Sequence, residues 1–293
     1  MFTPPACTRP VMMSLSSCLL ALLAIMILSA WTSPPPLPTQ GVPVDRSQDD
    51  AREATSFRVL VFSRTAGFRH DSIEDGIEAV RTLGSAHGFA VDATEDEAAF
   101  TLENLSRYRA VIFLSTTGNI LNREQRAAFE RYIKNGGGYV GIHAAADTGY
   151  DWPWYGRLVG GYFSSHPRVQ PAEVIVEDRD HPSTRHLPER WQRTDEWYDY
   201  RENPRGRVHV LMRLNTESYE GGRMGSDHPI AWCHEFDGGR SWYTGGGHTK
   251  DSFKEPAFLE HILGGIRWAA QRADPASDAP TPPVPAGGGS GPR

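Results

Sequence analysis

The chain has 293 residues, with 30 Lys and Arg against 36 Asp and Glu, and hence a formal net charge of −6. A mildly acidic chain without a basic run argues against nucleic acid as the partner, because nucleic acid binds to positively charged surfaces. Two of the three cysteines, Cys7 and Cys18, lie near the N-terminus. If export removes them, Cys233 has no internal partner, and stability must come from the core rather than from a disulfide.

The N-terminal segment predicts export. Residues 18–31 read CLLALLAIMILSAW, an apolar run of 14 residues, which suits a signal peptide better than a membrane span of roughly 20 residues. A signal peptidase site needs small residues one and three positions before the cut. Cleavage after Ala30 or after Thr32 meets this requirement only in part, so an uncleaved anchor is the alternative. We therefore expect residues 1–33 to be a signal peptide or N-terminal anchor. The protein should be periplasmic or secreted, with membrane association only through this segment.

Two further segments are expected outside the folded domain. Residues 34–56 begin with PPPLPTQGVP, where proline repeatedly blocks a helix and predicts an extended linker. Residues 273–293 are rich in Pro, Gly and small residues, which bury too little apolar surface to fold. What lies between them, residues 57–272, is long enough for one α/β domain with a full core.

The first half of this domain alternates strands with helices. Apolar runs predict strands at 58–63, 89–94, 110–115 and 139–143. Apolar residues at helical spacing predict helices at 72–87, 101–108 and 123–135. Asp71 or Ser72 would cap the first helix, Asn122 would cap the third, and the glycines 136–138 suit its end. Such alternation implies a parallel sheet with right-handed crossovers.

The pattern changes after Ala144. Residues 152–163, WPWYGRLVGGYF, are aromatic and rich in glycine, and they predict a helix with its turn. Closely spaced strands are predicted at 172–178, 207–214, 229–236 and 240–246. Because they lie so close together, part of this half should be antiparallel and added to the edge of the sheet. A last helix, 256–271, should pack on the sheet through its apolar stripe.

Polar side chains follow several of the predicted strands. Ligands of open parallel sheets bind beyond the carboxyl ends of the strands, so these segments are the place to look for a site. The candidate catalytic residues are His143, His166, Glu196 and His248. The candidate substrate-binding residues are His70, Asp147, Tyr155, Tyr198 and Lys250.

The chemistry of the histidines has two interpretations. Histidine transfers protons near neutral pH without large tuning of its pKa. Neutral imidazoles with one carboxylate also make a Zn²⁺ site, for which His143, His166 and His248 are the candidate ligands. The spacing matches no local metal motif, so both interpretations stay open. In either case these three side chains should converge on one pocket.

The same residues also have purely structural interpretations. Each histidine could simply hold its own loop, and the aromatic residues of 150–162 and 197–200 could form core instead of a wall that stacks on a sugar. Glu196 is flanked by Asp195 and Trp197, which predicts a raised pKa unless the acid is exposed. Five histidines in helix, strand or polar-loop patterns are expected to be structural or solvated: His87, His181, His186, His209 and His261.

Four segments resemble the ThuA-like family, named for a protein linked to bacterial trehalose utilisation: GFRHDSI, GGGYVGIHAAADTGYDWPWYGRLVGGYFSSHP, TDEWYDY and GGGHTKDSFKEPAFLEHILGGIRWA. The resemblance covers about residues 57–270, and the block 136–167 is its most specific part. It implies a flavodoxin-like fold similar to class I glutamine amidotransferases, an open, mostly parallel α/β sheet with helices on both faces. It also implies an association with sugar metabolism, for which keto-sugar processing has been proposed.

The amidotransferase pattern is incomplete in this chain. Those enzymes place a nucleophilic cysteine in a G-x-C-x-G turn, whereas the matching stretch here is G-I-H-A-A, with His143 in the place of the nucleophile. His248 is followed by Thr249 and Lys250 instead of by a glutamate two positions later. Glutamine amidotransfer is therefore not expected. The hypotheses are a hydrolase, lyase or isomerase that acts on a carbohydrate, and a non-catalytic module that binds one.

Overall fold

The computed structural model describes residues 57–271. The predicted signal peptide or anchor (1–33), the linker (34–56) and the tail (273–293) lie outside the described residues. Within the described range, no helix combines the length and the apolar character needed to cross a membrane.

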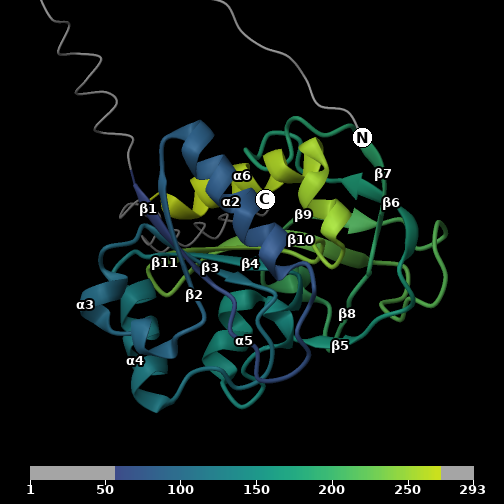
Figure 1. Ribbon diagram of the computed structural model, residues 1–293. Helices are drawn as coiled ribbons and strands as arrows, with labels where there is room; N and C mark the ends of the chain where they lie inside the picture. Colours follow the sequence, from purple (N-terminus) through teal and green to yellow (C-terminus); the bar gives the residue numbers. More distant parts are fainter. Residues whose placement is uncertain (1–56, 272–293) are drawn as a thin grey trace, which may run out of the picture. The chain divides into compact units, whose positions relative to one another are not determined.

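A nine-stranded sheet forms the centre of this part of the chain (Figure 1), in the order β2-β1-β3-β4-β11-β10-β9-β6-β7. Five of its strands run parallel: β1 (Arg58–Phe62), β2 (Ala90–Thr94), β3 (Ala110–Leu114), β4 (Gly138–Ile142) and β11 (Gly239–Thr244). Every residue of β3 and β4 is buried, as expected of parallel strands covered on both faces. The predicted mostly parallel α/β sheet is confirmed.

Antiparallel strands extend the sheet beyond β11, as predicted. They are β10 (His228–Phe236), β9 (His209–Leu214), β6 (Gln170–Val176) and β7 (Arg190–Asp195). A separate two-stranded sheet joins β5 (Phe163–Ser165) to β8 (Asp199–Tyr200). The sequence does not predict β7, because Arg193 and Asp195 share its inward face with Trp191. Without apolar alternation, the usual sign of a strand is absent.

Helices cover both faces of the sheet. Figure 1 shows α2 (Ile73–His87) and α6 (Pro256–Ala270) on one face, and α3 (Leu102–Leu105), α4 (Arg123–Lys134) and α5 (Pro153–Val159) on the other. The predicted cap of α4 by Asn122 is confirmed, because its side chain accepts the N–H of Gln125 at 2.9 Å. Ser72, one of the two predicted caps, is the N-cap residue of α2, but its side chain makes no capping hydrogen bond. Ser72 Oγ donates instead to the carbonyl oxygen of Gly247 at 3.1 Å.

The paired ends of β4 and β11 position the candidate site. These strands are parallel neighbours with Ile142 opposite Thr244, so His143 and Gly245 leave the sheet side by side at its carboxyl edge. The loop after β11 therefore runs next to the turn after β4. Two segments that are a hundred residues apart in sequence meet where an open sheet binds its ligands.

Candidate functional site

His143 holds a strained position at this edge. It follows β4 with a φ of 51°, a left-handed conformation that costs a non-glycine residue roughly 1–3 kcal/mol and is found mostly at functional sites. Its ring Nδ1 is 2.9 Å from the carbonyl oxygen of Gly245. Because a carbonyl can only accept, Nδ1 carries the proton. A neutral His143 therefore presents the lone pair of Nε2 to its other neighbours.

Glu196 joins three histidines into one cluster. Its Oε2 lies 3.5 Å from His143 Nε2 and 3.1 Å from His248 Nδ1. Its Oε1 lies 3.0 Å from His166 Nδ1. His143 Nε2 and His248 Nδ1 are 3.3 Å apart. The structure thus brings together the four residues that the sequence analysis names as catalytic, through direct contact rather than across a wide pocket.

The cluster sets the charge of its own members. Burial alone would raise the pKa of Glu196, but its close contacts with His143 and His248 hold it well below its usual range, so the carboxylate is ionised. The prediction of a raised pKa at Glu196 is therefore wrong, since it considered the aromatic neighbour and not the histidines. Burial lowers the pKa of His248, but its hydrogen bond to Glu196 and the charges of Glu196 and Asp195 outweigh burial and raise it.

Asp195 fixes the two backbones that carry the cluster. Its side chain is fully buried, and Oδ1 accepts the N–H groups of Glu196 at 2.9 Å and His248 at 3.1 Å. Oδ2 accepts from the N–H of Gly247 at 2.8 Å and lies 3.0 Å from Arg193 Nη1. One carboxylate therefore ties the end of β7 to the loop after β11. In the sequence, Asp195 stands out only as a neighbour of Glu196, because no pattern reveals an inward-facing acid at the end of a strand.

His70 completes the cluster from the loop after β1. Its ring centroid lies 4.8 Å from that of His143 and 5.2 Å from that of His248. Burial, with the nearby histidines, lowers the pKa of His70 to about 3, so the imidazole is neutral. His70, His143, His248 and Glu196 each offer one ligand atom, all within 4.8 Å of one another. This group could hold a metal ion, whereas His166, predicted as a metal ligand, is not part of it.

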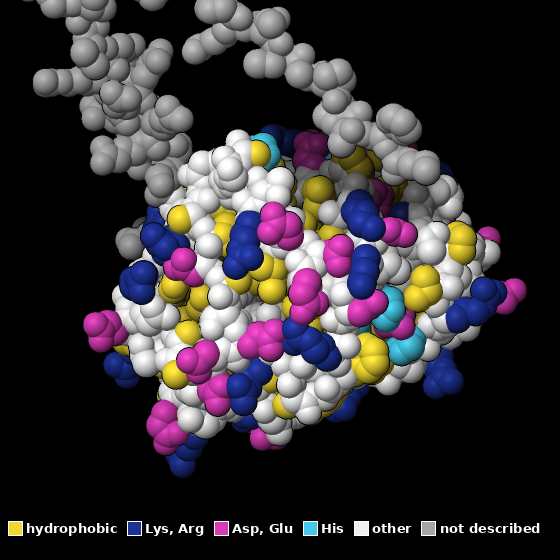
Figure 2. All heavy atoms as spheres, viewed as in Figure 1, with side chains coloured by type: hydrophobic (Ala, Val, Ile, Leu, Met, Phe, Trp, Pro, Cys, Tyr) yellow, Lys and Arg dark blue, Asp and Glu magenta, His cyan; other side chains and the backbone are white. Residues whose placement is uncertain are grey.

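A pocket of about 340 Å³ opens over the cluster. Its lining consists of Phe68, His70, Asp147, Phe163, His166, Glu196, Tyr198 and His248. The ring of Tyr198 lies 4.2 Å from that of His143 and 4.2 Å from that of Phe163, which gives the pocket an aromatic wall. Exposed side chains of histidine beside acidic and basic ones are also visible on the face drawn in Figure 2.

Asp147 contributes a second carboxyl group to the pocket. The hydroxyl of Tyr150 donates to its Oδ1 at 2.5 Å. Burial raises the pKa of Asp147 above its usual value despite that hydrogen bond, which favours the ionised form. Asp147 and Glu196 are thus two carboxyl groups in one pocket whose pKa values are moved in opposite directions.

Two predicted substrate-binding residues do not line the pocket, and these expectations are corrected. Tyr155 is fully buried, and its hydroxyl donates to the carbonyl oxygen of Ala145 at 2.7 Å and lies 2.8 Å from the hydroxyl of Tyr139. It is therefore a core residue without access to a ligand. Lys250 lies outside the lining residues, and its ammonium group is 3.3 Å from the exposed carboxylate of Asp71. The other predicted substrate-binding residues, His70, Asp147 and Tyr198, do line the pocket.

The five histidines expected to be structural or solvated lie away from the pocket lining. His261 is fully buried and its Nδ1 donates to the carbonyl oxygen of Ser183 at 2.8 Å. His209 pairs with Asp178 at 2.7 Å on the surface. Their surroundings are therefore those of packing and surface residues.

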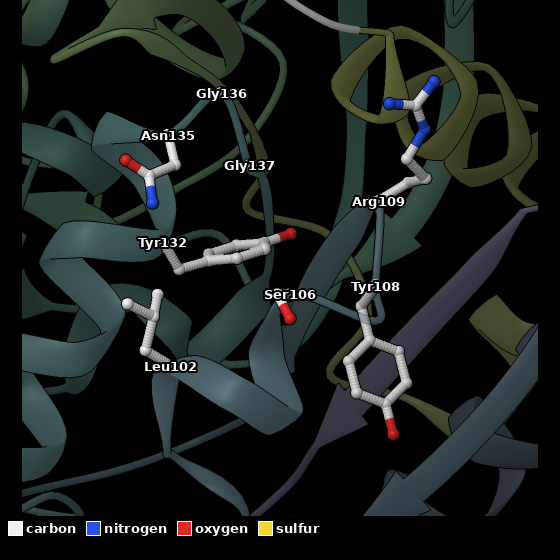
Figure 3. A pocket seen from close by; sticks show the side chains of 8 residues that line it. All are labelled: Leu102, Ser106, Tyr108, Arg109, Tyr132, Asn135, Gly136 and Gly137. Carbon is white, nitrogen blue, oxygen red and sulfur yellow. The ribbon is translucent and has the colours of Figure 1, made fainter.

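Another pocket lies at the other end of the parallel strands, opposite the cluster (Figure 3). Its lining consists of Leu102, Ser106, Tyr108, Arg109, Tyr132, Asn135, Gly136 and Gly137. Arg109 and Gly137 directly precede β3 and β4, so this pocket is at the amino ends of the strands. None of its eight lining residues is a histidine, an acid or a cysteine. It offers neither the position nor the titratable groups that the cluster provides.

Cys233 is not placed to act as a nucleophile. Its side chain is buried within β10, and burial raises the pKa of the thiol to about 12. A thiolate nucleophile requires the opposite shift and a base within hydrogen-bond reach. The chemistry of this site therefore belongs to the histidines and carboxylates.

Comparison with known proteins identifies similar chains. A family model for trehalose utilisation, ThuA, matches residues 58–269. A crystal structure described as a ThuA-like protein from Bacteroides uniformis is 30% identical, with a TM-score of 0.65, and the match covers 73% of this chain and 91% of that one. A second ThuA-like protein, from Parabacteroides merdae, is 21% identical with a TM-score of 0.61, over 73% of this chain and 90% of that one. No curated protein sequence matches the chain.

Proposed function

The chain belongs to the ThuA family, which has the glutamine amidotransferase-like fold, and we propose that it is an enzyme that acts on a carbohydrate, in particular a keto-sugar. One observation carries the proposal: an ionised glutamate, three histidines and a second carboxyl group share one pocket. The name of the family, trehalose utilisation, supports a sugar as the substrate. The buried Cys233 and the histidine at position 143 argue against glutamine amidotransfer.

The two carboxyl groups suit different parts of an acid–base reaction. A pair of titratable groups with oppositely shifted pKa values divides the roles of acid and base. In the absence of a metal ion, the ionised Glu196 stabilises the charged form of His248, which lines the pocket and is positioned to accept a proton from a substrate. Asp147, with its raised pKa, can hold a proton and donate it to a substrate oxygen on which negative charge develops.

The wall of the pocket suits a sugar ring. The tilted rings of Tyr198 and Phe163 pack against each other beside the cluster, and Phe68 lies near His70 with a ring distance of 4.9 Å. Such rings can pack against the apolar C–H face of a sugar while polar groups bind its hydroxyls. Carboxylates and imidazoles on the other side of the pocket provide those polar groups.

We further propose that the enzyme works outside the cytoplasm as one folded domain over residues 57–272. The apolar run 18–31 and the linker support this, although both lie outside the described residues. Membrane association would involve only that segment. On the face drawn in Figure 2, Lys and Arg are interspersed with Asp and Glu and form no single positive patch. This supports a small carbohydrate, and not nucleic acid, as the partner.

A panel of keto-sugars and their parent disaccharides tests the proposal. Turnover of at least one of them is expected, and Asp147→Asn should lower kcat about 10²- to 10⁴-fold, the usual contribution of a positioned proton donor. In the unmodified protein the rate should fall as the pH rises through the raised pKa of Asp147, because only its protonated form donates. The Asn variant should lack this fall.

Asp151→Asn is the matched control. Asp151 is exposed and pairs with Arg126 at 2.9 Å, outside the pocket lining, so its rate should be unchanged. Sugar binding without any turnover would instead favour a non-catalytic sugar-binding module. An equal loss of rate in both Asn variants would contradict the role of Asp147.

A further inference from the structure

Three atoms of the cluster have the spacing of ligands around a metal ion. His143 Nε2, His248 Nδ1 and Glu196 Oε2 form a triangle with sides of 3.3, 3.1 and 3.5 Å. A tetrahedral zinc ion with ligands at about 2.0–2.1 Å has its ligand atoms about 3.4 Å apart. The triangle therefore matches one face of such a tetrahedron without rearrangement.

The remaining polar atoms of His143 and Glu196 already have the partners typical of an outer shell. Histidine ligands usually donate their second ring N–H to a carbonyl or carboxylate, and His143 Nδ1 does so to the carbonyl oxygen of Gly245. Glu196 uses Oε1 for His166 and leaves Oε2 for the triangle. Asp195 anchors the backbones of Glu196 and His248 through two N–H groups. His143 Nε2 and Glu196 Oε2 thus keep lone pairs that face the metal position, whereas at His248 Nδ1 the metal would replace the proton that contacts Glu196.

His70 provides a fourth ligand. Only 3% of its surface is exposed, yet its buried Nδ1 has no hydrogen-bond partner among the described residues. One ring nitrogen of His70 lies within 4.8 Å of the other three ligand atoms. For tetrahedral spacing, its distances to the other three atoms need to shorten by up to about 1.4 Å, which requires a shift of the ring on the order of 1–2 Å. A buried imidazole without a protein partner, beside three ligand-spaced atoms, is otherwise costly.

We propose that His70, His143, His248 and Glu196 bind one divalent metal ion of the zinc class. His166 would not bind the ion but would position Glu196 through its contact with Oε1. Imidazole and carboxylate ligands suit zinc among the divalent ions. When bound, the ion would polarise a carbonyl or hydroxyl oxygen in the pocket. The inference concerns the site described above but does not depend on a sugar being the substrate. The competing explanation is a proton shared between His248, His143 and Glu196.

Metal content separates the two explanations. The full chain, produced in zinc-supplemented medium and purified without chelator, should contain about one zinc ion per chain by elemental analysis, as structural and catalytic sites do. His248→Ala and Glu196→Gln should lose most of this zinc. His166→Ala should keep its ligand set and weaken binding about 10- to 100-fold, as outer-shell changes do. His209→Ala, which alters a surface ion pair, is the control and should match the unmodified chain.

A thermal readout keeps the test independent of activity. After removal of metal with a chelator, zinc at about 100 times its Kd should raise the Tm of the unmodified chain by about 5–10 °C. Circular dichroism verifies that each variant is folded. The proposal is overturned if the unmodified chain binds neither zinc nor another divalent ion, or if His248→Ala and Glu196→Gln retain as much zinc as His209→Ala. A metal-free chain that turns over a sugar would refute only the metal, and a zinc-loaded chain without turnover would refute only the enzyme.

Discussion

Glu196→Gln is expected to lower kcat/KM at least about 10³-fold in a folded protein, the order of loss seen when the carboxylate partner of a catalytic histidine is replaced by an amide. Glutamine has nearly the same volume, so the packing is preserved. The negative charge that contacts three histidines disappears, however. In the chain freed of metal by a chelator, the pKa of His248 should fall as well, because the hydrogen bond and charge of Glu196 raise it. Steady-state kinetics and a pH titration of His248 by NMR measure both effects.

Glu202→Gln is the matched control for this change. Its side chain is 72% exposed and pairs with Arg207 at 2.8 Å on the surface, so kinetics and stability should stay close to those of the unmodified chain. If Glu196→Gln keeps its activity within tenfold of this control, Glu196 is not the centre of the site.

Arg193→Met should cause the largest loss of stability. The side chains of Arg193 and Asp195 are 4% and 0% exposed, and they pair at 3.0 Å. Removing one partner of a buried ion pair leaves the other charge uncompensated and costs about 3–5 kcal/mol. Methionine preserves much of the apolar contact with Trp191 and Phe258, over whose rings the guanidinium lies at 4.9 and 4.3 Å. The Tm should therefore fall by about 6–20 °C.

Arg190→Met offers a control on the same strand. The side chain of Arg190 is 58% exposed, and its ion pair with Glu173 lies at the surface, where such pairs contribute about 0–1 kcal/mol. Thermal or urea unfolding of both variants makes the comparison. If both variants lose the same free energy of unfolding, the buried ion pair does not stabilise the protein more than the surface pair. Arg193→Met should also reduce activity in its folded fraction, because Asp195 anchors Glu196 and His248.

The sheet was predictable because its parallel strands are apolar runs of strand length. β3 is buried at every residue and follows a short helix, so pattern and topology point to the same fold. This topology placed His143 at the carboxyl ends of the strands, but it did not show that β11 runs parallel beside β4 and brings His248 to the same place. β7 was not predictable, because a buried Arg193 and Asp195 replace the apolar side chains expected there.

The details of the site depend on side-chain direction, which strand order does not determine. Tyr155 points into the core, where its hydroxyl forms hydrogen bonds with the hydroxyl of Tyr139 and the carbonyl oxygen of Ala145. His166 contacts the outer oxygen of Glu196, whereas His70 from the first loop faces His143 and His248. The sequence shows that these residues follow strands, but it does not show which ring nitrogen faces which carboxylate oxygen.

The most direct test is a crystal structure of the Asp147→Asn protein with a bound keto-sugar that it turns over too slowly to consume. We expect the sugar in the pocket of Phe68, Phe163 and Tyr198, with its ring against the aromatic wall. A sugar oxygen should lie within hydrogen-bond distance of His248 or His166. A sugar bound instead beside Tyr132 in the pocket of Figure 3, or away from the histidine–glutamate cluster altogether, would contradict it.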